Sequence, residues 1–297
     1  MTSQGPSYTI GAARFEADRL APGLHIVATP IGNLGDITIR ALATLAAADR
    51  VLCEDTRTTA KLFQRFALRT PLSPYHEHNA QKVRPGIMAR LKEGACIALV
   101  SDAGMPLVSD PGYRLVREAV DAGIAVTACP GPSAVLTGLA LSGLPTDRFA
   151  FLGFLPQKSA ERTRLFAEVA PWRATLIFFE SPHRIVGALR DIAAVFPSRP
   201  VAMTRELTKL HEEVLRGTAS EIAAILDLRP SIKGEITLLI GPAGDAAEAV
   251  SEATLDAAIA ESLTSSPASK AAADVAKRFG VSKKDVYARI LALKPDA

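Results

Sequence analysis

The stretch "CIALVSDAGMPLVSDPGYRLVREAV", residues 96–120, decides the fold class. Five apolar residues come first, as in a buried strand, and an amphipathic segment with helical spacing ends the stretch. The loop between them holds two Ser-Asp pairs, two glycines and two prolines. A strand, a glycine-rich loop and a helix in this order are typical of an open α/β sheet, in which ligands bind at the carboxyl ends of strands.

The same alternation continues on both sides of this stretch. Short apolar runs at "LHIVA", "RVLCE" and "IAVTAC" alternate with helical segments, which predicts a parallel sheet with crossover helices. A second series runs from "FAFLGFLP" to "GEITLLIG". There "EEVLRGT" follows "TRELTKLH" too closely for a helical crossover, so the second sheet is predicted to be mixed. The expected organisation is an extension at 1–22, α/β domains at 23–145 and 146–242, and a linker with a helical domain at 243–297.

Composition limits the class of protein. The chain has 297 residues and is 48% hydrophobic. Its net charge of +3 is too small by itself to indicate a nucleic-acid partner. No apolar run reaches the roughly 20 residues of a membrane helix, and the N-terminus lacks the pattern of a signal peptide. We therefore expect a cytoplasmic protein without membrane association. The three cysteines show no paired spacing, which predicts buried thiols and no metal site.

Basic residues gather at the C-terminal end. From residue 270 onward there are seven basic and three acidic residues. The segment "VAKRFGVSKKDVYARIL" has the spacing of a helix-turn-helix, with Gly280 at the turn and Ser282 as N-cap of the last helix. If this domain binds RNA, phosphate contacts are expected from Lys277, Arg278, Lys283 and Lys284. The alternative is a helical hairpin with a solvated basic face.

The loops after the strands suggest a ligand other than a dinucleotide. "ATPIGNLGDIT" lacks one glycine of the dinucleotide fingerprint, and the chain has no phosphate-binding loop of the G-x-x-x-x-G-K-[ST] type. In the loop after residue 100, Asp110 is predicted to cap the following helix, with Pro111 at its first position. Asp102 has no such structural role, so it is a candidate ligand group. "CPGPSAV" adds a third rigid turn.

Three such loops in this order resemble the tetrapyrrole methylase superfamily, a class of S-adenosylmethionine enzymes with two α/β domains. The resemblance rests on "VATPIGNLGDIT", "CEDTR", "SDAGMPLVSDPGYRLV", "PGPSA", "FLGFLP", "FESPHR", "RELTK" and "KGEI". It is closest to the bacterial members that methylate the ribose 2′-oxygen of a cytidine in the decoding centre of 16S rRNA. Met105 departs from the family, which usually has a smaller polar threonine there.

The resemblance implies that main-chain groups hold S-adenosylmethionine in a cleft between the domains, and that the enzyme is a homodimer. The cofactor-binding residues it implies are Pro30, Gly32, Ser101, Asp102, Ala103, Gly104, Met105, Ser133, Ala134, Phe178, Phe179 and Gly234. Methyl transfer from a sulfonium depends mainly on positioning and requires no metal.

A ribose hydroxyl needs help to lose its proton, so a base or a stabilising cation is expected near it. The candidates are Glu180, Glu206 and Lys209, while Arg184, Arg205 and Arg57 are candidates for RNA phosphate contacts. Each has a structural alternative. Arg205 and Glu206 could form an ion pair at a strand end, and Asp55 could cap the helix that contains Arg57.

Two other functions remain open at this point. One is methylation of a precorrin-type small molecule, which has no evident use for a basic helix-turn-helix. The other is a non-catalytic RNA-binding protein that keeps the fold as a scaffold. Binding of S-adenosylmethionine would argue against the second.

Overall fold

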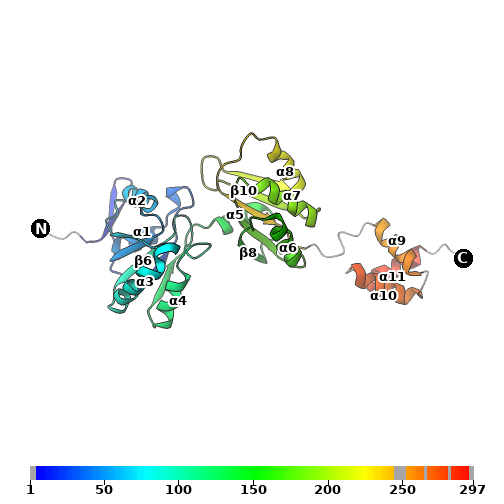
Figure 1. Ribbon diagram of the computed structural model, residues 1–297, viewed down its shortest axis with the longest axis horizontal. Helices are drawn as coiled ribbons and strands as arrows, with labels where there is room; N and C mark the ends of the chain where they lie inside the picture. The colour runs from blue at the N-terminus through cyan, green and yellow to red at the C-terminus, as the bar shows by residue number, and fades with distance from the viewer. Residues whose placement is uncertain (1–4, 244–251, 264–265, 280–281, 294–297) are drawn as a thin grey trace.

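The computed structural model describes residues 5–243, 252–263, 266–279 and 282–293. Figure 1 shows two units that each contain a sheet, and a helical unit that follows them along the chain. The predicted α/β class is confirmed, with a parallel first sheet and a mixed second sheet.

The first sheet has five parallel strands in the order β5-β4-β6-β3-β7. Their bounds are Gly23–Val27 (β3), Arg50–Cys53 (β4), Leu72–Pro74 (β5), Cys96–Val100 (β6) and Val126–Cys129 (β7). The central strand β6 is buried along almost all of its length, as its unbroken apolar run predicts. Its carboxyl end, and those of its neighbours, therefore point to the same edge of the sheet.

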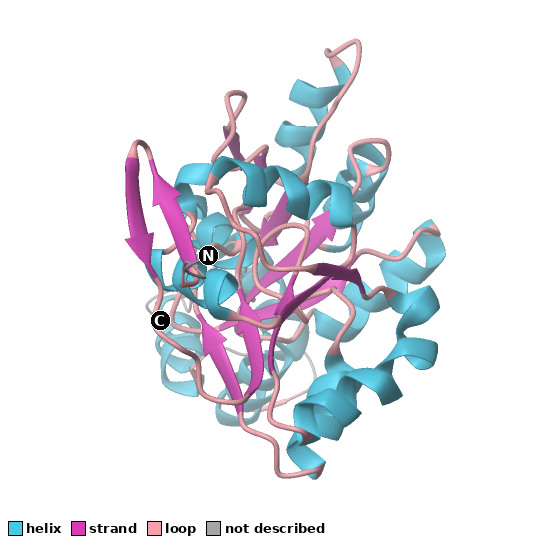
Figure 2. Ribbon diagram, turned by 90° about the vertical axis from the view of Figure 1, so that its left-hand side faces the viewer, coloured by secondary structure: helices cyan, strands magenta, loops and turns pink. Residues whose placement is uncertain are grey.

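Helices cover both faces of this sheet, as Figure 2 shows. α1 (Ile39–Ala47) and α2 (Thr56–Arg65) pack on one face, and α3 (Glu77–Lys92) and α4 (Tyr113–Asp121) on the other. A single turn of 3₁₀ helix, Leu34–Asp36, precedes α1. The predicted cap of α2 is confirmed, because the Asp55 carboxylate accepts a hydrogen bond from the Arg57 N–H at 2.8 Å.

A hairpin formed by β1 (Ser7–Ile10) and β2 (Ala13–Glu16) lies within the predicted N-terminal extension. Tyr8 is buried in the same apolar cluster as α1 and α2. The Thr9 N–H donates to the carbonyl of Phe66 at 2.8 Å, just after α2. The extension is thus packed on the first domain.

The second sheet has the order β11-β10-β12-β9-β8. The bounds are Phe149–Phe154 (β8), Thr175–Glu180 (β9), Val201–Arg205 (β10), Glu213–Gly217 (β11) and Ile236–Ile240 (β12). β8 and β9 are parallel, while β10 is antiparallel to both β11 and β12. The short connection between β10 and β11 is therefore a hairpin loop, as predicted.

Three helices, α6 (Ser159–Val169), α7 (Ile185–Val195) and α8 (Ala219–Asp227), cover one face of the second sheet. The other face is covered by α5 (Ala134–Ser142), which follows the last strand of the first sheet. Gly138 permits this close approach, because a Cβ there would lie 3.2 Å from the Thr237 side chain. α5 therefore ties the end of the first sheet directly to the second.

The C-terminal unit contains α9 (Glu252–Leu263), α10 (Ala268–Phe279) and α11 (Lys283–Ala292). Its apolar core includes Ile259, Val275 and Val286. Ser282 is the residue before α11, as predicted, although its side chain makes no capping hydrogen bond. The turn residue Gly280 lies outside the described residues. Within the described residues, no helix is long and apolar enough to cross a membrane.

Candidate active site between the two sheets

A cavity of about 460 Å³ lies where loops of the first domain meet the edge of the second sheet. The first domain contributes the loops that follow β3, β4 and β6, and the second contributes the ends of β8 and β9 and the start of β12. Its lining residues are Ile31, Glu54, Ser101, Asp102, Ala103, Val108, Ser109, Asp110, Ala134, Phe154, Phe179, Glu180, Ser181, Pro182, Gly234, Glu235, Ile236 and Thr237. The cavity is therefore at the carboxyl edge of the parallel sheet, where ligands bind in this fold class.

The loop after β6 is held in a tight, partly strained conformation. Gly104 and Gly112 have φ of +88° and +132°, and the non-glycine residues Leu107 and Ser109 also lie in the left-handed region, at +74° and +63°. Backbone strain of this kind persists only where surrounding contacts fix it, and it concentrates at functional sites.

Asp110 fixes this loop from inside, which corrects the predicted helix cap. The Ser101 hydroxyl donates to the Asp110 carboxylate at 2.5 Å. α4 begins at Tyr113, with Gly112 as N-cap and no capping side chain. Gly112 occupies the position before the helix, because its φ of +132° is one that aspartate and proline do not adopt. Asp110 is therefore free to line the cavity.

The loops after β3 and β6 are hydrogen-bonded to each other. Thr29 and Gly104 exchange two main-chain hydrogen bonds, of 2.9 and 3.0 Å. The Thr29 hydroxyl also donates to the Ser101 carbonyl at 2.9 Å. Gly104 thus braces the cavity without lining it, and Met105 packs into the apolar core beneath the sheet.

Carboxylates dominate the polar lining. Glu54, Asp102, Asp110, Glu180 and Glu235 line the cavity, and no lysine, arginine or histidine does so among the described residues. Burial is the main cause that raises the pKa of Glu54, Asp102 and Asp110 above their usual values. Neighbouring carboxylates add to the shift, Asp102 acting on both Glu54 and Asp110. A ligand with positive charge would relieve this repulsion.

Glu180 has a side chain with no exposed surface, at the end of β9. Its Oε1 accepts hydrogen bonds from the Ser181 N–H at 2.6 Å and from Arg184 at 2.7 and 2.9 Å. Its Oε2 is buried and has no hydrogen-bond partner. Buried acceptors without a partner are rare and point to a missing donor. Arg184 is the counter-ion of Glu180 in this structure, and its predicted contact with RNA phosphates stays a prediction.

Adjacent residues of β9 face opposite sides of the second sheet. Phe179 lines the cavity and packs against Phe151 and Phe154. Phe178 is completely buried on the other face, in edge-to-face contact with Phe166. The Phe178 side chain therefore does not line the cavity, because side chains alternate along a strand and only every second one reaches it. A main-chain role of Phe178 in cofactor binding stays a prediction.

A second hollow of about 260 Å³ adjoins the cavity and shares Ser101 and Asp102 with it. Pro30 and Gly32 line this hollow. A Cβ on Gly32 would lie 2.4 Å from Cγ of Lys209, so the lysine side chain of the second domain passes directly over the first loop. The glycine is required by this close approach rather than by its φ.

Lys209 lies between two carboxylates at the domain junction. Its Nζ donates to Glu206 at 2.8 Å and to Glu235 at 3.0 Å. Burial lowers the pKa of Lys209, but these hydrogen bonds outweigh it and the pKa is raised. The hydrogen bond from Lys209 lowers the pKa of Glu206. Gly234, at a φ of +95°, packs against Glu206 where a Cβ would clash.

The remaining arginine candidates are engaged locally. Arg205 donates to Glu213 at 3.0 Å, and Arg229 also binds this carboxylate. Arg57 is exposed and forms an ion pair with Asp55 at 2.6 Å. The structure thus gives Arg205 a counter-ion at the strand end, as in the structural alternative, although the partner is Glu213 rather than Glu206. A phosphate role for Arg57 stays a prediction.

The other predicted residues lie at the main cavity, at the N-terminus of α5 and in the C-terminal unit. Ala103 and Ala134 line the main cavity, and Ser133 caps α5 through a hydrogen bond from the Leu136 N–H at 3.4 Å. Lys283 and Lys284 are exposed in the first turn of α11. Lys277 and Arg278 belong to α10, but their side chains lie outside the described set.

Sequence reasoning missed several lining residues. Glu54 follows β4 directly, as Asp102 follows β6, so the same strand-end signal could have identified it. Phe154 and Glu235 lie in the quoted strings "FLGFLP" and "KGEI" but gave no local signal of their own.

Comparison with known proteins identifies the family. The family model for tetrapyrrole (corrin/porphyrin) methylases matches residues 23–223, and a model described as "RsmI C-terminal HTH domain" matches residues 248–294. Ribosomal RNA small subunit methyltransferase I of Mesorhizobium japonicum is 48% identical over 96% of this chain and 97% of its own length. The chain belongs to the ribosomal RNA small subunit methyltransferase I family. The Escherichia coli O157:H7 member of this family is 43% identical over 91% of the chain and 95% of its own length.

Solved structures share the fold of this methyltransferase. A diphthine synthase aligns with a TM-score of 0.55 at 14% identity, over 73% of this chain and 89% of its own. A uroporphyrin-III C-methyltransferase from Thermus thermophilus, crystallised with S-adenosylhomocysteine, aligns with a TM-score of 0.50 at 19% identity, over 74% and 97% of the two chains. At these identities the likeness shows the fold alone.

Proposed function

We propose that this methyltransferase transfers the methyl group of S-adenosylmethionine to the ribose 2′-oxygen of a cytidine in the decoding centre of 16S rRNA. One observation carries the proposal. A cavity with an acidic and aromatic lining lies between the two sheets of a chain that is 48% identical to a ribosomal RNA small subunit methyltransferase I. The names of such relatives favour rRNA over a precorrin-type substrate.

The lining fits S-adenosylmethionine chemically. The cofactor carries positive charge on its sulfonium and its amino group, and the cavity offers five carboxylates and no cation among its described lining residues. Phe179, Phe154 and Ile31 provide apolar surface for a flat adenine ring. The unpartnered Oε2 of Glu180 is an acceptor for a ligand N–H or O–H group. The predicted cofactor-binding loops at Pro30–Gly32 and Ser101–Ala103 line the two connected hollows.

The cofactor supplies a methyl group that is already activated by its sulfonium, so the protein mainly has to align the ribose oxygen and manage its proton. Of the predicted catalytic residues, Glu180 retains a carboxylate oxygen that accepts no hydrogen bond, and we assign it as proton acceptor. Lys209 has a raised pKa and stays protonated, so its role is that of a cation near the developing charge. Glu206 has a lowered pKa and positions Lys209.

The test is methyl transfer from labelled cofactor to purified 30S subunits or bare 16S rRNA. Ribose 2′-O-methylation is mapped by resistance of the adjacent linkage to alkaline cleavage. We expect E180Q to lose at least tenfold in kcat. The control E168Q, on the exposed surface of α6, is expected to keep wild-type activity. If no label is transferred to rRNA in 30S subunits or in bare 16S rRNA, the proposed substrate is contradicted. An E180Q variant with normal kcat would contradict the role of Glu180.

The C-terminal unit and the assembly complete the proposal. We propose that Lys283 and Lys284, which are exposed in the first turn of α11, contact RNA phosphates. K283Q/K284Q is expected to raise KM for rRNA without changing the affinity for S-adenosylmethionine. We further propose a cytoplasmic homodimer, which sedimentation of the purified chain would test. A monomer with full activity would refute the dimer and leave the reaction unaffected.

A further inference from the structure

A basic face on α2 and the turn after it is not used by the proposed mechanism. Residues 56–75 contain Arg57, Lys61, Arg65 and Arg69, spaced four apart, and no acidic residue. All four side chains are exposed. Arg57, Lys61 and Arg65 lie in α2, where residues four apart share one side and rise about 6 Å per step, whereas Arg69 lies after the end of the helix. Lys61, Arg65 and Arg69 are called the α2 basic face below.

These three charges have no counter-ion in the described part of the chain. Arg57 is paired with Asp55, but no ion pair of the described residues involves Lys61, Arg65 or Arg69. Other arginines of this protein are neutralised within the fold, for example Arg162 by Asp191 and Arg229 by Glu213. The α2 basic face therefore presents positive charge that is not paired within the described part of the fold.

One end of this face reaches the active site. Lys61 lines the second hollow together with Pro30 and Gly32, and this hollow shares Ser101 and Asp102 with the main cavity. The main-chain N–H of Asp55, at the start of α2, donates to Asp102 at 3.1 Å. The helix thus begins at the cavity and leads away from it.

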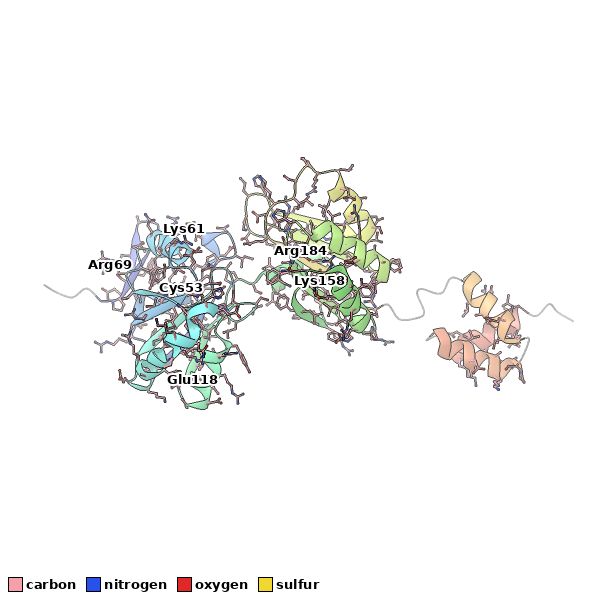
Figure 3. All side chains as sticks on the ribbon, viewed as in Figure 1. Cys53, Lys61, Arg69, Glu118, Lys158 and Arg184 are labelled. Carbon is pink, nitrogen blue, oxygen red and sulfur yellow. The ribbon has the colours of Figure 1, made fainter. Side chains whose placement is uncertain are left out.

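The other end reaches a hollow of about 430 Å³ beside the N-terminal hairpin. Arg69 and Arg14 both line it, together with polar groups such as Ser7, Thr9 and Thr70. Figure 3 shows Lys61 and Arg69 on the same part of the first domain, away from Glu118 on α4. Positive groups therefore follow one path from the active site to the outer surface.

We propose that the α2 basic face binds the phosphate backbone of the rRNA strand next to the target nucleotide. The inference rests on the proposed function. The acidic cavity repels phosphates, so a target ribose must enter from a backbone that is held outside it. Lys61 and Arg65, about one helical turn apart on α2, and Arg69 after its end supply that hold, and the hollow at Arg14 and Arg69 receives the strand farther along.

The test compares two triple variants that each remove three positive charges. K61Q/R65Q/R69Q neutralises the α2 basic face. K82Q/K92Q/R114Q neutralises exposed residues of α3 and α4, on the opposite face of the first sheet. Binding of bare 16S rRNA is measured by filter retention from 50 to 300 mM salt, and S-adenosylmethionine affinity by calorimetry.

We expect K61Q/R65Q/R69Q to bind 16S rRNA at least tenfold more weakly at 100 mM salt. The slope of log K against log salt should fall by about 2, since each contact to a single strand contributes about 0.7. R65Q/R69Q, which leaves Lys61 in place at the second hollow, should keep the affinity for S-adenosylmethionine within about twofold of wild type, which shows that the site is intact. The control should match the wild-type protein in both measurements.

Two results of the binding experiment would overturn the inference: an unchanged salt slope in K61Q/R65Q/R69Q, or an equal loss of affinity in the control, which would indicate a general charge effect. If the wild-type protein methylates 30S subunits and the triple variant has the same KM for them, the α2 basic face does not bind the rRNA, and the proposed function still stands. Wild-type protein that transfers no methyl group to rRNA would refute the proposed function instead.

Discussion

Replacing Arg184 by methionine is expected to destabilise the second sheet domain by removing the counter-ion of a buried carboxylate. The Glu180 side chain has no exposed surface, and Arg184 supplies two of the three hydrogen bonds on its Oε1. Methionine keeps a side chain of similar length and helix propensity at the start of α7. The loss of stability in R184M therefore reports the electrostatic role of the guanidinium rather than a change in packing.

The magnitude follows from the burial of the two partners. Breaking a buried ion pair from one side costs about 3–5 kcal/mol. The Arg184 side chain is 28% exposed, so water replaces part of the lost contact, and we expect a loss of about 2–4 kcal/mol in the free energy of unfolding. In thermal unfolding this corresponds to a fall in Tm of about 5–10 °C.

The assay is urea unfolding of R184M, E180Q, E180Q/R184M and R190M. Arg190 lies on α7, the helix that follows Arg184, and pairs with Asp227, but both side chains are largely exposed, so R190M should cost less than about 1 kcal/mol. The double variant should recover about 1 kcal/mol or more relative to R184M, because its buried group is neutral. An R184M variant as stable as R190M, or a double variant no better than R184M, would refute the reasoning.

Three further outcomes follow from the site. F178A should lose about 3–5 kcal/mol of unfolding free energy, whereas F179A should mainly weaken S-adenosylmethionine binding. Urea unfolding measures the first effect and calorimetry the second, and equal effects of the two variants would contradict the assigned strand faces. Burial raises the pKa of Asp102, so the affinity for S-adenosylmethionine should be full above that pKa and fall as pH drops through it. The fall should be smaller in D102N, and an identical pH profile of the two proteins by calorimetry would contradict a role of Asp102 in binding. Hydrogen bonds from Arg229, then Arg205, hold the pKa of Glu213 at about 2, so its stabilisation is complete above the unfolded value and is lost as pH falls toward 2. E213Q should thus lower the free energy of unfolding by about 2 kcal/mol at pH 7 and by about half as much at pH 3, and a constant difference would argue against the ion pair.

Local sequence patterns determined the elements of the fold. The apolar run "CIALV" gave a buried parallel strand, and the short spacing between β10 and β11 gave an antiparallel hairpin. Asp55 was predictable as a helix cap, because a cap involves only groups within the same turn. The glycine-rich loops at strand ends also pointed to the cavity, since their position at the carboxyl edge follows from the parallel sheet.

Partner choice between distant segments was decided by the tertiary structure. Nothing near Asp110 in sequence indicates that it accepts from Ser101 instead of capping α4, and nothing near Arg205 selects Glu213 over Glu206. Such pairings depend on which side chains the folded backbone brings within about 3 Å. For each charged group, the local sequence offers several partners between which it does not distinguish.

The sequence by itself determined which segments form strands, helices and ligand-binding loops, and its family resemblance indicated the chemistry. Only the tertiary structure decided that Phe179 and not Phe178 faces the cavity, that α5 packs on the second sheet, and that Glu54, Asp102 and Asp110 meet in one acidic lining. Hydrophobic periodicity and helix capping involve neighbouring residues, so they can be recognised along the chain. Which side of a strand faces the cavity, and which groups surround a buried charge, depend on residues that are remote in sequence.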